Sequence, residues 1–148
     1  MIDIEALVGR LRDRDDKSAY AAFLELQEES RRSNKVYPYF DRFASLIEEE
    51  SSYARTRGLL LVAANARWDV DYKVDEIIDQ CLVHVMDVKP TVSRQLIAAL
   101  PELARYKGDL RSDIRRALER ANPGRYRDSM APLIQKDISK ALREIDAL

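Results

Sequence analysis

The sequence is short of cysteine and histidine. Cys81 and His84 are the only residues of these two types among 148. A single cysteine cannot form an intramolecular disulfide, and a structural zinc site normally takes four cysteine or histidine ligands. We therefore expect a chain that folds without disulfide, metal or cofactor, in a reducing compartment such as the cytoplasm.

Chain breakers and long apolar runs are also scarce. Four glycines and five prolines leave few residues for long loops. The longest uninterrupted apolar run, residues 59–64, is far shorter than the roughly 20 residues that span a bilayer. The first residues, which include Asp3 and Glu5, lack the basic and apolar regions of a signal peptide. We expect a cytoplasmic protein with no membrane contact.

An excess of charge of one sign is missing as well. The 25 lysines and arginines nearly cancel 26 aspartates and glutamates, for a net charge of −1. No global field therefore draws the chain onto nucleic acid or anionic lipid. With 46% apolar residues, a chain of this length can bury a core as one domain, which we expect over residues 1–148.

Apolar residues recur at three- and four-residue spacing almost throughout, and no stretch alternates with the period of two that a half-buried strand requires. The pattern predicts an all-α fold of about eight helices in four antiparallel pairs, over about residues 4–32, 38–67, 74–108 and 109–145. Expected N-caps include Asp15 or Asp16 and Ser51 or Ser52. The expected core includes Tyr20, Phe23, Leu24, Leu61, Ile77, Cys81, Leu82 and Leu100.

The pairs show an internal repeat. Four pairs give about 37 residues per pair, close to the ~40 of HEAT and armadillo repeats. A shift of 39 residues lays the second pair on the third with residue character preserved. Matching positions include Leu46 on Val85, Tyr53 on Val92, Arg55 on Arg94 and Leu61 on Leu100.

The turn chemistry within the pairs resembles that of HEAT-like repeats. An acidic residue ends the first helix and an arginine lies near the start of the second, as in Glu48 with Arg55. The segments YPYFD (37–41), YARTRG (53–58), ARWD (66–69) and DSMAPLI (128–134) resemble a small bacterial HEAT-like family whose members are often labelled SufBD-like. The resemblance implies a HEAT/armadillo-like α-solenoid and no particular activity. One cysteine gives no support to iron–sulfur assembly, because clusters usually take several thiolates.

Cys81 and His84 are three residues apart and share a helix face, which could pair a thiolate with a base or supply two metal ligands. Cys81 also falls in an apolar stripe, and we interpret it as a packing residue. Asn65 and Trp68 are interpreted as a buried hydrogen-bonded tie and a cover over a helix end.

Five carboxylates gather where the fifth helix begins, a composition that hard cations favour. The positive end of the helix dipole explains them without an ion. We therefore expect no metal site. The cluster consists of Asp69, Asp71, Asp75, Glu76 and Asp79.

Basic residues on the second helices of the pairs are the candidate partner contacts. Arg55 and Arg94 either line a basic strip or bind acidic groups and carbonyls at the turns. Arg57 has no equivalent one repeat later, because Leu96 takes its place, so we expect it to be an exposed contact for an acidic partner. Lys136 completes this set.

No enzyme motif is present: there is no glycine-rich phosphate loop, nucleophile elbow or HExxH. We expect no catalytic residue and a protein-interaction or scaffold module, because stacked helix pairs expose a surface that can vary independently of the core. The alternative is a nucleic-acid-binding repeat resembling the HEAT-like DNA-alkylation-repair glycosylases. The balanced charge makes nucleic acid the less favoured partner.

Overall fold

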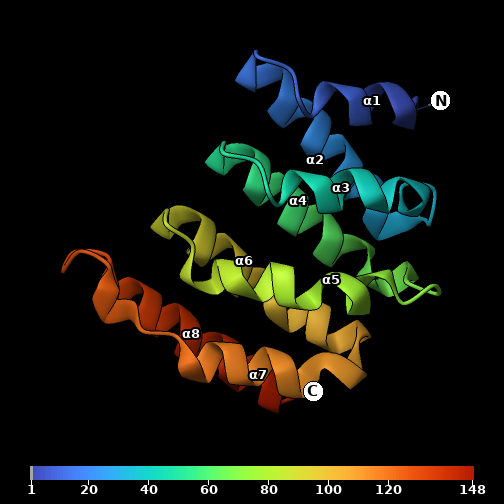
Figure 1. Cartoon of the computed structure of the whole chain (residues 1–148). Coiled ribbons are helices and arrows are strands. Elements are labelled where there is room, and N and C mark those ends of the chain that lie inside the picture. Colours follow the sequence, from blue (N-terminus) through green and yellow to red (C-terminus); the bar gives the residue numbers. More distant parts are fainter. Residues whose placement is uncertain (1) are drawn as a thin grey trace. The chain divides into compact units, whose positions relative to one another are not determined.

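The computed structural model describes residues 2–148, and over that range the chain is helical with no β-strand (Figure 1). It contains eight α-helices and five short 3₁₀ helices in these residues. The predicted all-α class and helix number are confirmed. The α-helices are α1 (Ile4–Arg10), α2 (Asp16–Arg32), α3 (Phe40–Leu46), α4 (Ser52–Asn65), α5 (Lys73–Leu82), α6 (Pro90–Tyr106), α7 (Arg111–Arg120) and α8 (Ala131–Asp146).

The helices form two compact units, Met1–Lys73 (unit 1) and Val74–Leu148 (unit 2). Unit 1 holds α1 to α4, and unit 2 holds nearly all of α5 with α6 to α8. The single domain expected from the sequence stays a prediction. No helix within residues 2–148 combines the length and apolar character needed to cross a lipid bilayer.

In unit 1, α1 packs on α2, α3 packs on α4, and α2 also packs on α4 (Figure 1). The side chains of Asp3, Asp15 and Ser51 accept hydrogen bonds from backbone N–H groups in the first turns of α1, α2 and α4. Those N–H groups have no partner within the helix, so a short polar side chain fixes where each helix begins. The predicted caps at Asp15 and Ser51 are confirmed.

Gly58 brings α4 close to α3. A Cβ atom at this position would lie 2.7 Å from the carbonyl oxygen of Phe43 and 2.8 Å from the Cβ of Leu46. Both distances are shorter than van der Waals contact. Because Gly58 has no side chain, the two helix backbones can meet here, and any larger residue would force them apart.

The buried face of α2 differs from the expected one. Tyr20 and Leu24 were predicted to be core, but they are 51% and 44% exposed. The helix instead buries small residues, Ala19 and Ala22, together with Phe23 and other residues of the same face. Small side chains let the neighbouring helices approach α2, and the two larger ones are left on the outside.

Ser30, in the last turn of α2, ties that helix to the end of α4. The side-chain amide of Asn65 donates to the Ser30 Oγ at 3.1 Å and to the Leu61 carbonyl at 2.9 Å. The indole N–H of Trp68 donates to the Ser30 carbonyl at 2.7 Å. Asn65 was predicted to be a buried tie to a neighbouring backbone; it is fully buried, but its partner on the neighbouring helix is the Ser30 side chain.

In unit 2, α8 packs on both α6 and α7, and the 3₁₀ helix η3 (Val83–Met86) packs on α6. Pro90 occupies the first position of α6, where its missing N–H leaves no hydrogen bond broken. α5 and η3 bury Val74, Ile78, Cys81 and Val85.

Two residues predicted to be core in this region are only half-buried, namely Ile77 and Leu82. α5 ends at Leu82 and continues as η3, and the side chains of Cys81 and Val85 are buried. Leu82 follows Cys81 directly and so points about 100° away from that face, given 3.6 residues per turn.

The internal repeat coincides with helix boundaries. Moving α4 along the chain by 39 residues places it on residues 91–104, inside α6. Leu61 and Leu100 match in this shift, and both are fully buried, as predicted. Tyr53 and Val92 also match, but they are 64% and 1% exposed. Burial in the core therefore does not constrain the residue at position 53 as it does the residue at position 92.

Candidate functional site

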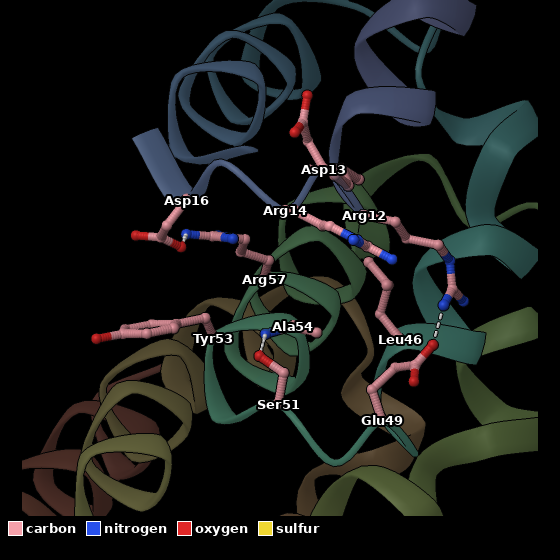
Figure 2. Close-up of a pocket in the computed structure, with 11 residues that line it drawn as sticks. Arg12, Asp13, Arg14, Asp16, Leu46, Glu49, Ser51, Tyr53, Ala54 and Arg57 are labelled. Atoms are coloured by element: carbon pink, nitrogen blue, oxygen red, sulfur yellow. Dashed lines mark hydrogen bonds and ion pairs between the residues drawn. The ribbon is translucent and has the colours of Figure 1, made fainter. Parts of the chain in front are cut away.

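A groove of about 470 Å³ opens in unit 1 between the turn that joins α1 to α2 and the beginning of α4 (Figure 2). The α1–α2 turn supplies three of its charged residues, the start of α2 supplies Asp16, and the α3–α4 turn and α4 supply the others. Charges of both signs line it, in the residues Arg12, Arg14, Arg57, Asp13, Asp16 and Glu49.

Arg57 lies at one side of this groove and is only 7% exposed. Its Nη2 donates to the Asp16 Oδ1 at 2.6 Å, which ties α4 to the amino end of α2. Its guanidinium carbon is 6.0 Å from the ring centre of Tyr20 and 5.7 Å from that of Tyr53. The expectation that Arg57 is exposed is therefore wrong, because an ion pair and two aromatic rings cover it.

The other two arginines of the groove differ in their partners. Arg12 forms an ion pair with Glu49. Arg14 is exposed, and its side chain forms no hydrogen bond or ion pair within residues 2–148. Figure 2 shows the Arg14 side chain between those of Arg12 and Arg57. Arg14 thus brings to the groove a positive charge that forms no ion pair with any carboxylate of the described residues.

The acidic residues beside Arg14 belong to the amino end of α2. The Asp13 Oδ1 accepts a hydrogen bond from the Asp15 N–H at 2.9 Å, and the Asp15 Oδ1 accepts one from the Lys17 N–H at 3.1 Å. The positive end of a helix dipole stabilises carboxylates in such positions. The negative charges therefore already have favourable partners in the turn.

Two tyrosines flank Arg57, and one of them, Tyr53, lines the groove, an arrangement that sequence reasoning missed. Tyr53 is 64% exposed and was assigned no role, whereas Tyr20 was placed in the core. A tyrosine four residues before an arginine on one helix is a local signal that could have linked Tyr53 to Arg57. No local pattern links Tyr20 to Arg57, because they lie on different helices.

Arg55 points to the carbonyls at the end of the preceding turn. Its Nη1 donates to the Glu49 carbonyl at 3.1 Å and to the Glu50 carbonyl at 2.7 Å. The sequence left two roles open for Arg55, part of a basic strip or binding to groups at the turns, and these hydrogen bonds correspond to the second. It explains the burial of the residue, which is 7% exposed. A partner contact at Arg55 stays a prediction.

In unit 2, Arg94 joins α6 to α8 through Asp137, with its Nε 2.6 Å from Oδ2. This hydrogen bond raises the pKa of Arg94 above its usual value. Lys136, next to Asp137 in the chain, is exposed on α8. Arg94 therefore has a structural partner within its own unit, and the partner-binding role of both residues stays a prediction.

Cys81 is 1% exposed, which confirms it as a packing residue. The Nδ1 of His84 lies 2.6 Å from the Oδ1 of Asp87. The Oδ2 of Asp87 accepts a hydrogen bond from the Lys89 N–H at 2.8 Å, so Asp87 holds the turn into α6. Across residues 2–148, no three His, Cys, Asp or Glu side chains gather closely enough to hold a metal ion.

The acidic residues around the start of α5 have separate structural partners. Asp69 accepts hydrogen bonds from the Tyr37 hydroxyl at 2.7 Å and from the Lys73 N–H at 2.9 Å. Burial raises the pKa of Tyr37 well above its usual value, and the hydrogen bond to Asp69 raises it further. Asp75 instead lies 2.6 Å from the Nζ of Lys107.

Lys107 and Asp109 form a charge cluster with Asp75 that sequence reasoning missed. The Lys107 side chain is only 6% exposed. A hydrogen bond to Asp75 raises the pKa of Asp109. Burial raises the pKa of Asp75, but hydrogen bonds to Asp109 and Lys107 outweigh it, so the pKa lies below its usual value. The cluster fixes the end of α6 to the first turn of α5.

Comparison of the chain with protein-family models, with curated proteins and with solved structures finds no match.

Proposed function

We propose that the protein is a HEAT/armadillo-like α-solenoid of four antiparallel helix pairs that serves as a non-catalytic protein-interaction or scaffold module. Pairwise packing of α1 with α2, α3 with α4 and α7 with α8 supports the pairs. Contacts of α2 with α4, and of α6 with α8, support side-by-side second helices within each unit. The 39-residue shift and the resemblance to the small bacterial HEAT-like family point the same way.

The observation that carries the interaction role is the exposed aromatic surface around Arg57. Tyr20 and Tyr53 flank the guanidinium of Arg57. Leu24 lies one turn after Tyr20 on α2 and is also exposed. Tyrosine and arginine are enriched among the residues that dominate binding energy at protein interfaces. Because the ion pair with Asp16 already holds Arg57, little side-chain entropy is lost when a partner covers it.

This surface lies on the second helices of the first two pairs, where the sequence places the partner contacts. The direct contacts we propose are Tyr20, Leu24 and Tyr53, with Arg57 holding the two rings in place. Arg55, Arg94 and Lys136 are kept as further candidate contacts.

The test is affinity capture from the native host, quantified by mass spectrometry, with Tyr53→Ser alone and combined with Tyr20→Ser. Tyr72→Ser is the control, because Tyr72 is also 64% exposed and also lies in unit 1. We expect at least one protein to be captured about tenfold less by the double variant and equally by the control. Equal capture by all four proteins, with unchanged circular dichroism, would exclude this surface.

A second candidate, nucleic-acid binding, rests on the turn between α7 and α8. Arg120, Arg125 and Arg127 are exposed there, and their side chains have no hydrogen-bond or ion-pair partner within residues 2–148. The hydroxyl of Tyr126 fixes the turn by donating to the Asp87 carbonyl at 2.6 Å. Binding of a labelled DNA duplex that weakens steeply with salt, and that is lost in Arg125→Gln, would favour this candidate.

A further inference from the structure

One arginine of the groove beside Arg57 forms no ion pair in the described part of the chain. Arg12 is paired with Glu49 and Arg57 with Asp16, whereas Arg14 has no counter-charge within residues 2–148. An exposed arginine in water needs no partner. This one, however, lies between two arginines already fixed by ion pairs (Figure 2).

The guanidinium of Arg57 has N–H groups that are not hydrogen-bonded within residues 2–148. A guanidinium carries five N–H groups, and one nitrogen of Arg57 binds Asp16 while no other hydrogen bond of this side chain is present in the described residues. Figure 2 shows Asp16 and Arg14 on opposite sides of the Arg57 guanidinium. A ligand oxygen that enters from the Arg14 side would therefore meet Arg14 first and would approach Arg57 from the side away from the carboxylate of Asp16.

The lining also limits the charge of the ligand. Asp13, Asp16 and Glu49 balance the charge of the three arginines in the same groove. The lining therefore has no excess of positive charge that would favour a doubly charged phosphate over a singly charged carboxylate. The Tyr53 ring at the edge offers an apolar contact that suits a side chain next to the carboxylate.

We propose that this groove binds an acidic side chain of a partner polypeptide, with Arg14 as the direct ion-pair contact, Arg57 as the second donor and Tyr53 as the surface for a neighbouring aromatic side chain. The inference rests on the proposed protein-interaction function and specifies the chemistry of the partner. A volume of about 470 Å³ lies within the range of pockets that enclose small ligands, so it can hold such a pair of side chains.

The test uses the full-length protein labelled with ¹⁵N and follows the Nε–Hε signals of arginine and the backbone amides of residues 11–16 and 51–57 by NMR. The probes are a capped Ala-Phe-Glu-Ala peptide, the matched Ala-Phe-Gln-Ala peptide and inorganic phosphate. The variants are Arg14→Gln and the control Arg143→Gln, which removes another exposed arginine whose side chain has no hydrogen-bond or ion-pair partner within residues 2–148.

We expect the glutamate peptide to shift these signals, with affinity reduced by up to about fivefold in Arg14→Gln and unchanged in Arg143→Gln. The same affinity should fall as salt is raised, because exposed charges are screened. No shift with the glutamate peptide would overturn the inference.

Two other outcomes would also overturn it and leave the proposed function intact. Equal affinity for the glutamine peptide would show that the aromatic side chain alone is recognised. Tighter binding of inorganic phosphate would show a general anion site. Failure of the proposed interaction function would be recognised in the affinity-capture experiment, where the variants of Tyr20 and Tyr53 would capture the same proteins as the wild type.

Discussion

Replacement of Gly58 by alanine adds one methyl group where α4 meets α3. The new carbon would lie 2.7 Å from a backbone oxygen, that of Phe43, and 2.8 Å from the Cβ of Leu46. Neither atom is the flexible end of a side chain. One helix must therefore shift against the other, or the new side chain must remain compressed.

The magnitude follows from two opposing effects. In a helix interior, alanine is favoured over glycine by about 1 kcal/mol. Overpacking of a well-packed interior typically costs about 1–3 kcal/mol, and contact with rigid backbone places Gly58 near the upper end. We expect Gly58→Ala to lower the free energy of unfolding by about 1–2 kcal/mol, which corresponds to roughly 2–8 °C in Tm.

The assay is urea unfolding followed by circular dichroism, with Gly9→Ala as the matched control. Gly9 also lies in a helix, α1, but a Cβ atom there would meet nothing within 4 Å. The control should gain about 0.4–1 kcal/mol from reduced freedom of the unfolded chain. If Gly58→Ala is stabilised as much as Gly9→Ala, the close approach of α4 to α3 is wrong.

Three further predictions concern residues whose burial is known. Leu100→Ala should lower the free energy of unfolding by about 2–5 kcal/mol and Leu82→Ala by clearly less, and equal losses in urea unfolding would contradict the half-burial of Leu82. Cys81 should react with a thiol reagent far more slowly in the folded protein than in urea, and rapid labelling of the folded protein would place it at the surface. The pKa of Tyr37 is raised on folding, so its contribution to stability is fully present below its unfolded pKa of about 10 and is lost as pH rises above that value. The free energy of unfolding should thus fall more between pH 9 and 11 in the wild type than in Tyr37→Phe, and parallel losses would remove Tyr37 as the cause.

Local patterns in the sequence predict the helices well. A helix needs only its own apolar periodicity and a polar residue at its start, so the helix number and the caps at Asp15 and Ser51 could be placed in advance. The buried face is harder to predict where a helix has two apolar sides. In α2 the alanines are covered and Tyr20 is not, which depends on how closely neighbouring helices approach.

The groove could be predicted only in part, because it too depends on which residues the packing of the helices brings together. The absence of a repeat equivalent singled out Arg57, and the structure places it in the groove. Its partner Asp16, however, lies 41 residues away in the chain, and no spacing rule connects residues so far apart. The importance of Arg14 likewise depends on its having no ion-pair partner in the described residues, which the sequence alone does not reveal.

The hydrogen bond from Trp68 to Ser30 gives the protein a built-in optical reporter for one unit alone. The sequence contains one tryptophan, and it belongs to unit 1. Its fluorescence will change when the end of α4 leaves α2, while unit 2 contributes no indole emission. Far-ultraviolet circular dichroism, in contrast, reports the helices of both units. Coincident transitions by the two signals would show that the units unfold as one cooperative domain, and separate transitions would give each unit its own stability.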